Sequence, residues 1–143
     1  MYEDILGRVD LFTNLNKKEL KELTSGAQER KYSAGTTLFS QGDTGTGLYV
    51  LTHGKVRITQ AQNPDRAEED LGTLGGGEVL GEMALLDDLP RSATATAVED
   101  TTVILLPVWD FRMALHNQPD IGLKLLSVLS RRLRQAEGRL ADR

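Results

Sequence analysis

One glycine-rich stretch, residues 75–93, decides how the rest of the chain is interpreted, and it reads Gly75-Gly76-Gly77-Glu78-Val79-Leu80-Gly81-Glu82-Met83-Ala84-Leu85-Leu86-Asp87-Asp88-Leu89-Pro90-Arg91-Ser92-Ala93. Gly81 lets the backbone come close to a ligand, and residues 82–86 are expected to form one short helical turn. The free N–H groups and the dipole of such a turn favour an anion. Arg91 is the only formally positive residue of the stretch, and its planar guanidinium suits phosphate oxygens. The stretch therefore predicts a phosphate site.

Glu82 is the unusual member of this stretch, because a carboxylate beside a phosphate is repelled unless it faces another group. An ionised carboxylate only accepts hydrogen bonds, so a hydroxyl donor suits it. An acceptor and an anion site a few ångströms apart match the two sides of a ribose that carries a cyclic phosphate. We therefore expect the 2′-hydroxyl at Glu82 and the phosphate at Arg91.

A family resemblance follows from the same residues. Gly81-Glu82-Met83-Ala84-Leu85-Leu86, followed by Pro90-Arg91-Ser92-Ala93, resembles the phosphate-binding cassette of cyclic-nucleotide-binding domains, most closely that of kinase regulatory subunits. Two positions depart from the family pattern: Leu80 stands where an aromatic residue is common, and Asp88 where a glycine often relaxes the loop. The resemblance implies that the ligand-binding residues lie in the cassette, residues 80–93: Leu80, Gly81, Glu82, Met83, Ala84, Arg91, Ser92 and Ala93.

A simpler interpretation of the charged pair stays open. A glutamate and an arginine nine residues apart in an acidic chain are often surface charges, with Arg91 weakly paired to Asp87 or Asp88. The surrounding glycines favour the ligand site over this alternative.

Short strands separated by glycines are expected from about residue 31 to residue 107. The strands are expected at 36–39, 48–52, 56–59, 93–98 and 102–106, with a polar loop over 63–70. Alternation places Val56 and Ile58 inside, and residues 48–56 resemble the family's core hairpin, with His53 capping it. Ala93, Ala95 and Ala97 suit either tight packing between sheets or space for a nucleotide. This pattern predicts a mainly β fold with flanking α-helices, an eight-stranded double-sheet jelly-roll barrel.

Helices are expected on both sides of these strands. Asn16 is expected to cap a helix over 17–25, with Glu19 at its third position. Two more helices are expected at 108–117 and from 120 to about 140, the second opened by Pro119. The chain is thus predicted to be one domain over 1–143, with a helical segment 1–28, a β-roll 30–107 and carboxy-terminal helices 108–141.

The last helix carries a heptad seam of apolar residues, formed by Leu126, Leu129, Leu133, Ala136 and Leu140. Two interpretations stay open: the seam packs on the barrel, or it pairs with a second copy in a homodimer, as the equivalent helix does in the catabolite activators of the family. The family's mechanism also implies that this helix swings over the base as a lid, with Arg132 and Ala136 near the purine.

Composition narrows the class of protein. With 39% hydrophobic and 27% charged residues, no long apolar run and no secretory signal, the chain is expected to be cytoplasmic and not in a membrane. It has no cysteine and only two histidines, His53 and His116, so no metal and no cupin-like oxygenase is expected. Its net charge of −4 argues against direct nucleic-acid binding, and a helix-turn-helix reader would need some tens of residues beyond Arg143.

The predicted function is that of a sensor and not of an enzyme. No nucleophile with a suitable base is evident, and neither the dinucleotide nor the P-loop glycine spacing is met. The expected ligand is cyclic AMP, with cyclic GMP as the second candidate. In the family that the cassette resembles, a hydroxyl residue after the cassette arginine can contact the guanine or the phosphate, and Ser92 is compatible with either contact. Two alternatives remain: the sensing half of a helix-turn-helix transcription regulator, and a protein-interaction barrel without a ligand.

Overall fold

The computed structural model describes residues 2–63, 65–87 and 89–141, and the side chains of residues up to 138 within those ranges. The chain forms two compact units. One is Gly26–Trp109, the β-roll unit, and the other joins the residues up to Ser25 with those from Asp110 onward, the helical unit. The expectation of one domain stays a prediction.

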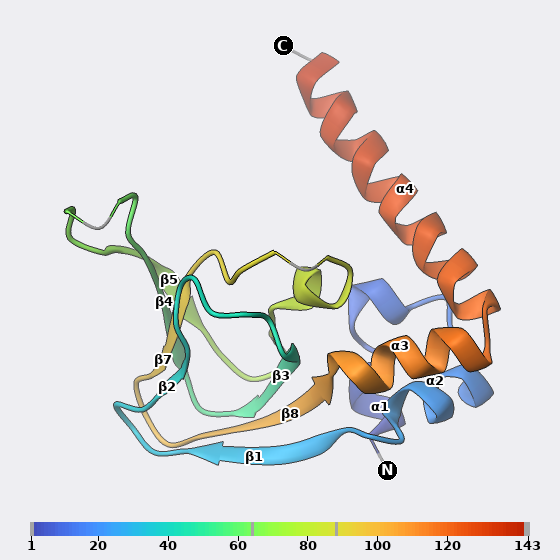
Figure 1. Ribbon diagram of the computed structural model, residues 1–143, viewed down its shortest axis with the longest axis horizontal. Helices are drawn as coiled ribbons and strands as arrows, with labels where there is room; N and C mark the ends of the chain where they lie inside the picture. Colours follow the sequence, from blue (N-terminus) through green and yellow to red (C-terminus); the bar gives the residue numbers. More distant parts are fainter. Residues whose placement is uncertain (1, 64, 88, 142–143) are drawn as a thin grey trace. The chain divides into compact units, whose positions relative to one another are not determined.

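The described residues of the β-roll unit form eight strands in two antiparallel four-stranded sheets, which confirms the predicted double-sheet jelly roll (Figure 1). One sheet has the order β1-β8-β3-β6 and the other β2-β7-β4-β5. The strands are β1 Gln28–Tyr32, β2 Thr37–Phe39, β3 Gly47–His53, β4 Val56–Gln60, β5 Glu69–Leu74, β6 Val79–Leu80, β7 Thr94–Ala97 and β8 Thr101–Pro107.

The core of this unit follows the alternation of the strands. Val56 is fully buried and pairs with Ala97 of β7. Ile58 pairs with Ala95 and packs, half-buried, against the core cluster of buried residues that includes Val56, Ala95 and Ala97. Because Ala95 and Ala97 are themselves buried, their small side chains serve packing between strands. The tight-packing interpretation therefore fits these two alanines.

The hairpin expected at residues 48–56 is wrong, since β3 and β4 belong to different sheets. Gly54 connects them with φ +96°, a conformation that favours glycine. A Cβ atom at this position would lie 2.6 Å from the backbone oxygen of Asp100. The chain thus crosses between the two layers at a point where no side chain fits.

Two boundaries differ from the expectation. The polar loop predicted over 63–70 ends earlier, because β5 begins at Glu69, and β1 begins at Gln28, inside the segment expected to be helical. Glu69 and Asp70 are exposed on an edge strand, where charged side chains reach water and remain compatible with pairing. The end of the loop was predicted from the polarity of its residues alone, and that prediction was wrong because charged residues also occur in this edge strand.

Local capping fixes the first long helix of the helical unit. The elements assigned to the helical segments are α1 Glu3–Leu6, η1 Asp10–Phe12, α2 Lys17–Thr24, α3 Val108–Asn117 and α4 Asp120–Ala141. The predicted capping box is confirmed: Glu19 N donates to Asn16 Oδ1 at 2.8 Å, and Asn16 N donates to Glu19 Oε1 at 2.9 Å. Lys124 Nζ of α4 lies 2.6 Å from the same Glu19 oxygen and joins the two helices.

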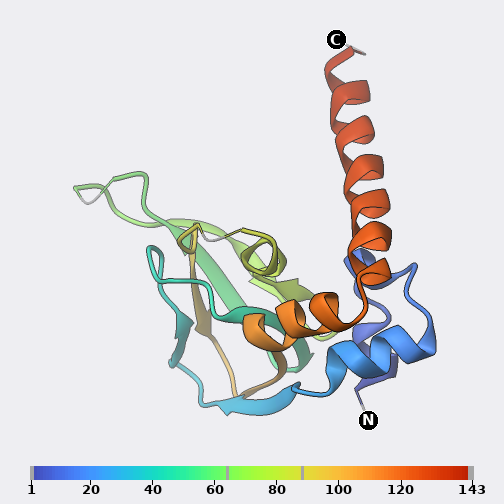
Figure 2. The same cartoon turned by 45° about the vertical axis from the view of Figure 1, so that its right-hand side comes forward.

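α4 is one continuous helix (Figure 2). It buries Ile121, Leu125 and Val128, whereas Leu126 and Leu133 of the expected seam are 62% and 60% exposed. The side chain of Leu140 lies outside the described residues. Whether the seam packs on the barrel or pairs with a second copy stays a prediction. In the described ranges, none of the helices has the length and apolar character needed to cross a membrane.

Candidate functional site

A cavity of about 470 Å³ opens in the β-roll unit, within the size range of small-molecule sites. Strands β2, β4, β5 and β6 and the cassette contribute its walls. Its lining residues are Phe39, Ile58, Leu74, Val79, Leu80, Gly81, Met83, Ala84, Asp87, Leu89, Pro90, Arg91, Ser92 and Ala93. Every ligand-binding residue expected from the sequence is among them except Glu82.

The cassette takes its shape from Gly81, which has φ +72° and precedes the short 3-10 helix η2, Glu82–Leu85. The N–H of Ala84 donates to the Gly81 oxygen at 3.1 Å and closes the turn. A Cβ atom on Gly81 would collide with Nη1 of Arg91. The close approach predicted for Gly81 is therefore made, in this structure, to the arginine of the same site.

Arg91 lies in the wall of the cavity and is only 7% exposed. Its Nη2 donates to the carbonyl oxygen of Gly47 at 2.8 Å, and its Nη1 lies 3.5 Å from that of Gly81. Its backbone is fixed as well: Arg91 N donates to Asp43 O at 2.7 Å, and Gly42 N donates to Arg91 O at 2.8 Å. Main-chain groups of the segment 42–47 and of Gly81 thus position Arg91.

The simpler interpretation of Arg91 as a surface charge does not fit this burial. Asp87, one of its suggested partners, uses its carboxylate to accept from Leu89 N at 3.1 Å. Asp88, the other, lies outside the described residues. Within the described ranges, no ion pair joins Arg91 to a carboxylate. The guanidinium is therefore buried without an ion-paired carboxylate among those residues.

Burial has electrostatic consequences for this cation. Burial away from water lowers the pKa of Arg91 from its ordinary value, because desolvation disfavours the charged form. Electrostatic interactions with Tyr49 and Asp43 oppose that shift. Its Nε is buried and has no hydrogen-bond partner, an arrangement that costs free energy. An anionic oxygen at the cavity wall would supply both the missing acceptor and the missing negative charge.

Glu82 stands at the start of η2, half-buried, and does not line the cavity. The structure thus brings the phosphate half of the expected site to the cavity and leaves the ribose acceptor outside its lining. The role of Glu82 toward a ribose stays a prediction.

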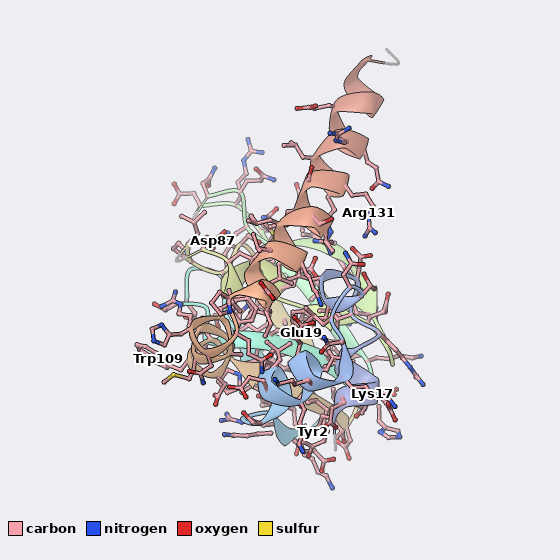
Figure 3. The ribbon with its side chains drawn as sticks, turned by 90° about the vertical axis from the view of Figure 1, so that its right-hand side faces the viewer. Tyr2, Lys17, Glu19, Asp87, Trp109 and Arg131 are labelled. Carbon is pink, nitrogen blue, oxygen red and sulfur yellow. The ribbon has the colours of Figure 1, made fainter. Side chains whose placement is uncertain are left out.

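The two residues expected over the base belong to α4 of the helical unit. Arg132 donates from Nε and Nη2 to Asp10 Oδ2 at 3.0 and 2.8 Å, and Arg131 Nη2 donates to Asp10 Oδ1 at 2.8 Å. Figure 3 labels the side chain of Arg131 on α4. Ala136 is exposed. Their position as a lid stays a prediction.

The sequence left several lining residues unassigned. Phe39 and Ile58 lie in two of the expected strands, and inward alternation was the signal for Ile58. Asp87, Leu89 and Pro90 fall inside residues 75–93 but were not expected to bind the ligand. Over the described part of the chain, no group of three or more histidine, cysteine, aspartate or glutamate side chains is placed to bind a metal ion.

Comparison with known proteins identifies the family. A family model described as the cyclic nucleotide-binding domain matches residues 29–118. The chain is 40% identical over 127 residues to the cyclic AMP receptor protein of Thermus thermophilus, covering 89% of this chain and 58% of that protein. It is 31% identical over 140 residues to a CRP-like cAMP-activated global transcriptional regulator of Mycobacterium tuberculosis, covering 98% and 62%.

A solved structure agrees with these matches. The N-terminal domain of a transcriptional regulator from Streptomyces coelicolor A3(2) has a TM-score of 0.84 and 36% identity, over 96% of this chain and 95% of that one. This chain belongs to the cyclic nucleotide-binding domain family. The resemblance drawn from the cassette is thereby confirmed. The chain spans 58% and 62% of the length of the two relatives named above.

Proposed function

We propose that this chain is a regulatory sensor, not a catalyst, that binds cyclic AMP in preference to cyclic GMP with the cyclic phosphate at Arg91. One observation carries the proposal: a buried guanidinium with an unsatisfied Nε lines an apolar-walled cavity of about 470 Å³. A cyclic phosphodiester supplies one negative charge and acceptor oxygens, and its base and sugar fit a cavity of that size. The names of the two relatives, a cyclic AMP receptor and a cAMP-activated regulator, support the choice of ligand.

Titration calorimetry with cyclic AMP and cyclic GMP tests this proposal directly. Cyclic AMP at 100 times its dissociation constant is expected to stabilise the folded protein by about 2.7 kcal/mol, which thermal unfolding with and without the nucleotide measures. The matched control ligand is 5′-AMP, which has the same base and sugar but an open phosphate. Absence of both heat and thermal shift with the two cyclic nucleotides would instead favour a protein-interaction barrel without a ligand.

The Glu82→Gln variant is expected to lose much of its discrimination against 2′-deoxy cyclic AMP. A hydrogen bond to a charged acceptor is stronger than one to a neutral amide, so the preference for the ribose ligand should shrink by about tenfold. Calorimetry with both nucleotides measures the ratio. Glu78→Gln is the matched control, because this substitution removes the same charge nearby. Glu78 accepts a hydrogen bond from Gly75 N and does not line the cavity. Equal losses of affinity for both nucleotides in Glu82→Gln would contradict the ribose role.

A second function is favoured by the relatives: the sensing part of a transcription regulator. Two relatives are a receptor and a regulator of which this chain spans 58% and 62%, and the solved structure is the N-terminal domain of a transcriptional regulator. In this proposal α4 pairs with a second copy through Leu126 and Leu133, which are exposed, and moves when the ligand binds. Light scattering with and without cyclic AMP measures the molecular mass of the particle in solution and so its oligomeric state. Hydrogen exchange of the α4 amides in the two states measures the movement of this helix. A monomer whose α4 exchanges identically in both states would contradict it.

A further inference from the structure

An aromatic ring lies against the guanidinium of the phosphate site. The Cζ atom of Arg91 is 4.3 Å from the centroid of the Phe39 ring and 5.6 Å from that of Tyr49. The two ring centroids are 5.6 Å apart, with planes inclined by 39°. Both distances to Arg91 fall within the range in which a cation is attracted to the face of an aromatic ring.

The chemical nature of the group that packs against the Arg91 guanidinium matters for binding, because Arg91 would have to attract a ligand anion. A carboxylate beside it would neutralise its charge and occupy its N–H groups. An aromatic face attracts the cation through the ring quadrupole and accepts no conventional hydrogen bond from it. The rings therefore stabilise the buried guanidinium while its charge and its Nε donor stay available to an incoming anion.

The two rings have different places in the fold. Tyr49 of β3 is 4% exposed and belongs to the core cluster, and it does not line the cavity. Phe39 is the last residue of β2, is paired with Ala95 of β7, and both packs on that cluster and lines the cavity. Phe39 is thus the ring that connects the core of the β-roll to the wall where Arg91 lies.

We propose that Phe39 is a positioning residue of the phosphate site, whose ring fixes the guanidinium of Arg91 at the cavity wall in the orientation that receives the ligand phosphate. The inference rests on the proposed function, since it names the residue that prepares the same site. Phe39 acts through Arg91 and need not contact the phosphate itself. Its effect is therefore expected to depend on the presence of a ring and not on side-chain volume alone.

Three variants test this inference by calorimetry with cyclic AMP. Phe39→Leu is expected to weaken binding by about 5- to 20-fold, and Phe39→Tyr, which keeps the ring, to stay within about threefold of the wild type. Leu38→Val is the matched control, because Leu38 is the preceding residue of β2 and is buried in the same cluster but does not line the cavity. It should lower stability and leave affinity within about twofold of the wild type.

A spectroscopic measurement on the ligand-free protein gives a readout that general loss of stability would not reproduce. The Nε–H resonance of Arg91 is expected to be shifted upfield by the Phe39 ring, a shift that Phe39→Tyr keeps and Phe39→Leu abolishes. Phe39→Met replaces the leucine variant in both measurements if the latter does not fold.

The outcomes distinguish failure of the proposed function from failure of the role proposed for Phe39. If the wild type takes up no cyclic nucleotide, the proposed function fails, and the Arg91 resonance still decides whether the ring fixes the guanidinium. An unchanged Arg91 resonance in the variant without a ring overturns the inference. So does equal affinity of Phe39→Leu and wild type, or an equal loss in Leu38→Val.

Discussion

The Arg91→Ala variant is expected to bind cyclic AMP about 2 to 5 kcal/mol more weakly than the wild type, the usual cost of truncating one partner of a buried charge pair. Arg91 is the one cation in the lining of the cavity, among the residues described there, so no neighbouring charge replaces it. The fixed contacts to Gly47 and Gly81 also mean that little side-chain entropy is lost when the phosphate binds. Titration calorimetry measures the change in affinity.

Arg57→Ala is the matched control for this variant. Arg57 is in β4 of the same unit, its side chain is 54% exposed, and it does not line the cavity. Its removal changes the net charge by the same amount, so affinity should stay within about twofold of the wild type. Equal weakening in both variants would show that the overall charge of the protein, and not the position of Arg91, attracts the nucleotide. Unchanged affinity in Arg91→Ala would refute the site itself.

The Gly54→Ala variant is expected to lose about 3 to 5 kcal/mol of folding free energy, the sum of backbone strain and of overpacking at a crowded position. Gly54 has φ +96°, and its Cβ would lie 2.6 Å from Asp100 O and 2.7 Å from Thr101 Cα. Both are backbone atoms, one just before β8 and one in its first residue, and they cannot rotate away as a flexible side chain can. Urea unfolding followed by circular dichroism measures the loss.

Gly35→Ala separates the two contributions. Gly35 has a similar φ of +87°, but no heavy atom lies within 4 Å of its Cβ position. It should therefore show the backbone strain alone, about 1 to 3 kcal/mol. Equal losses in the two variants would contradict the claim that the crossing between the sheets excludes a side chain.

The parts of the fold that the sequence predicted depend on neighbours along the chain. The capping box of Asn16 and Glu19 spans four residues, and the cassette is contiguous, so both were recognisable without tertiary information. The alternation of Val56 and Ile58 likewise needed only the local strand pattern.

The parts of the fold that the sequence did not predict depend on contacts between segments that lie far apart in the chain. Whether β3 and β4 pair with each other or with other strands depends on β8 and β7, which lie tens of residues later. Phe39 meets Arg91 only because β2 and the cassette come together in the fold, and no local pattern marks such a contact. For Glu82 the local motif was recognisable, but the motif did not predict that this residue would be absent from the cavity lining.

The backbone contacts of Arg91 have an evolutionary consequence. Its hydrogen-bond acceptors, the oxygens of Gly47 and Gly81, and its own backbone partners at Gly42 and Asp43 are all peptide groups. Because these contacts use main-chain groups, neutral drift at the intervening exposed positions Thr44 and Thr46 leaves this scaffold intact. A Cβ atom on Gly45 or Gly47 would collide with Ala84 or with the backbone of Leu106, so these two glycines are constrained. Insertions or deletions that reroute the segment 42–47 would abolish the scaffold, so in a lineage that keeps the arginine we expect the length of this segment and its glycines to be inherited more strictly than the residues at 44 and 46.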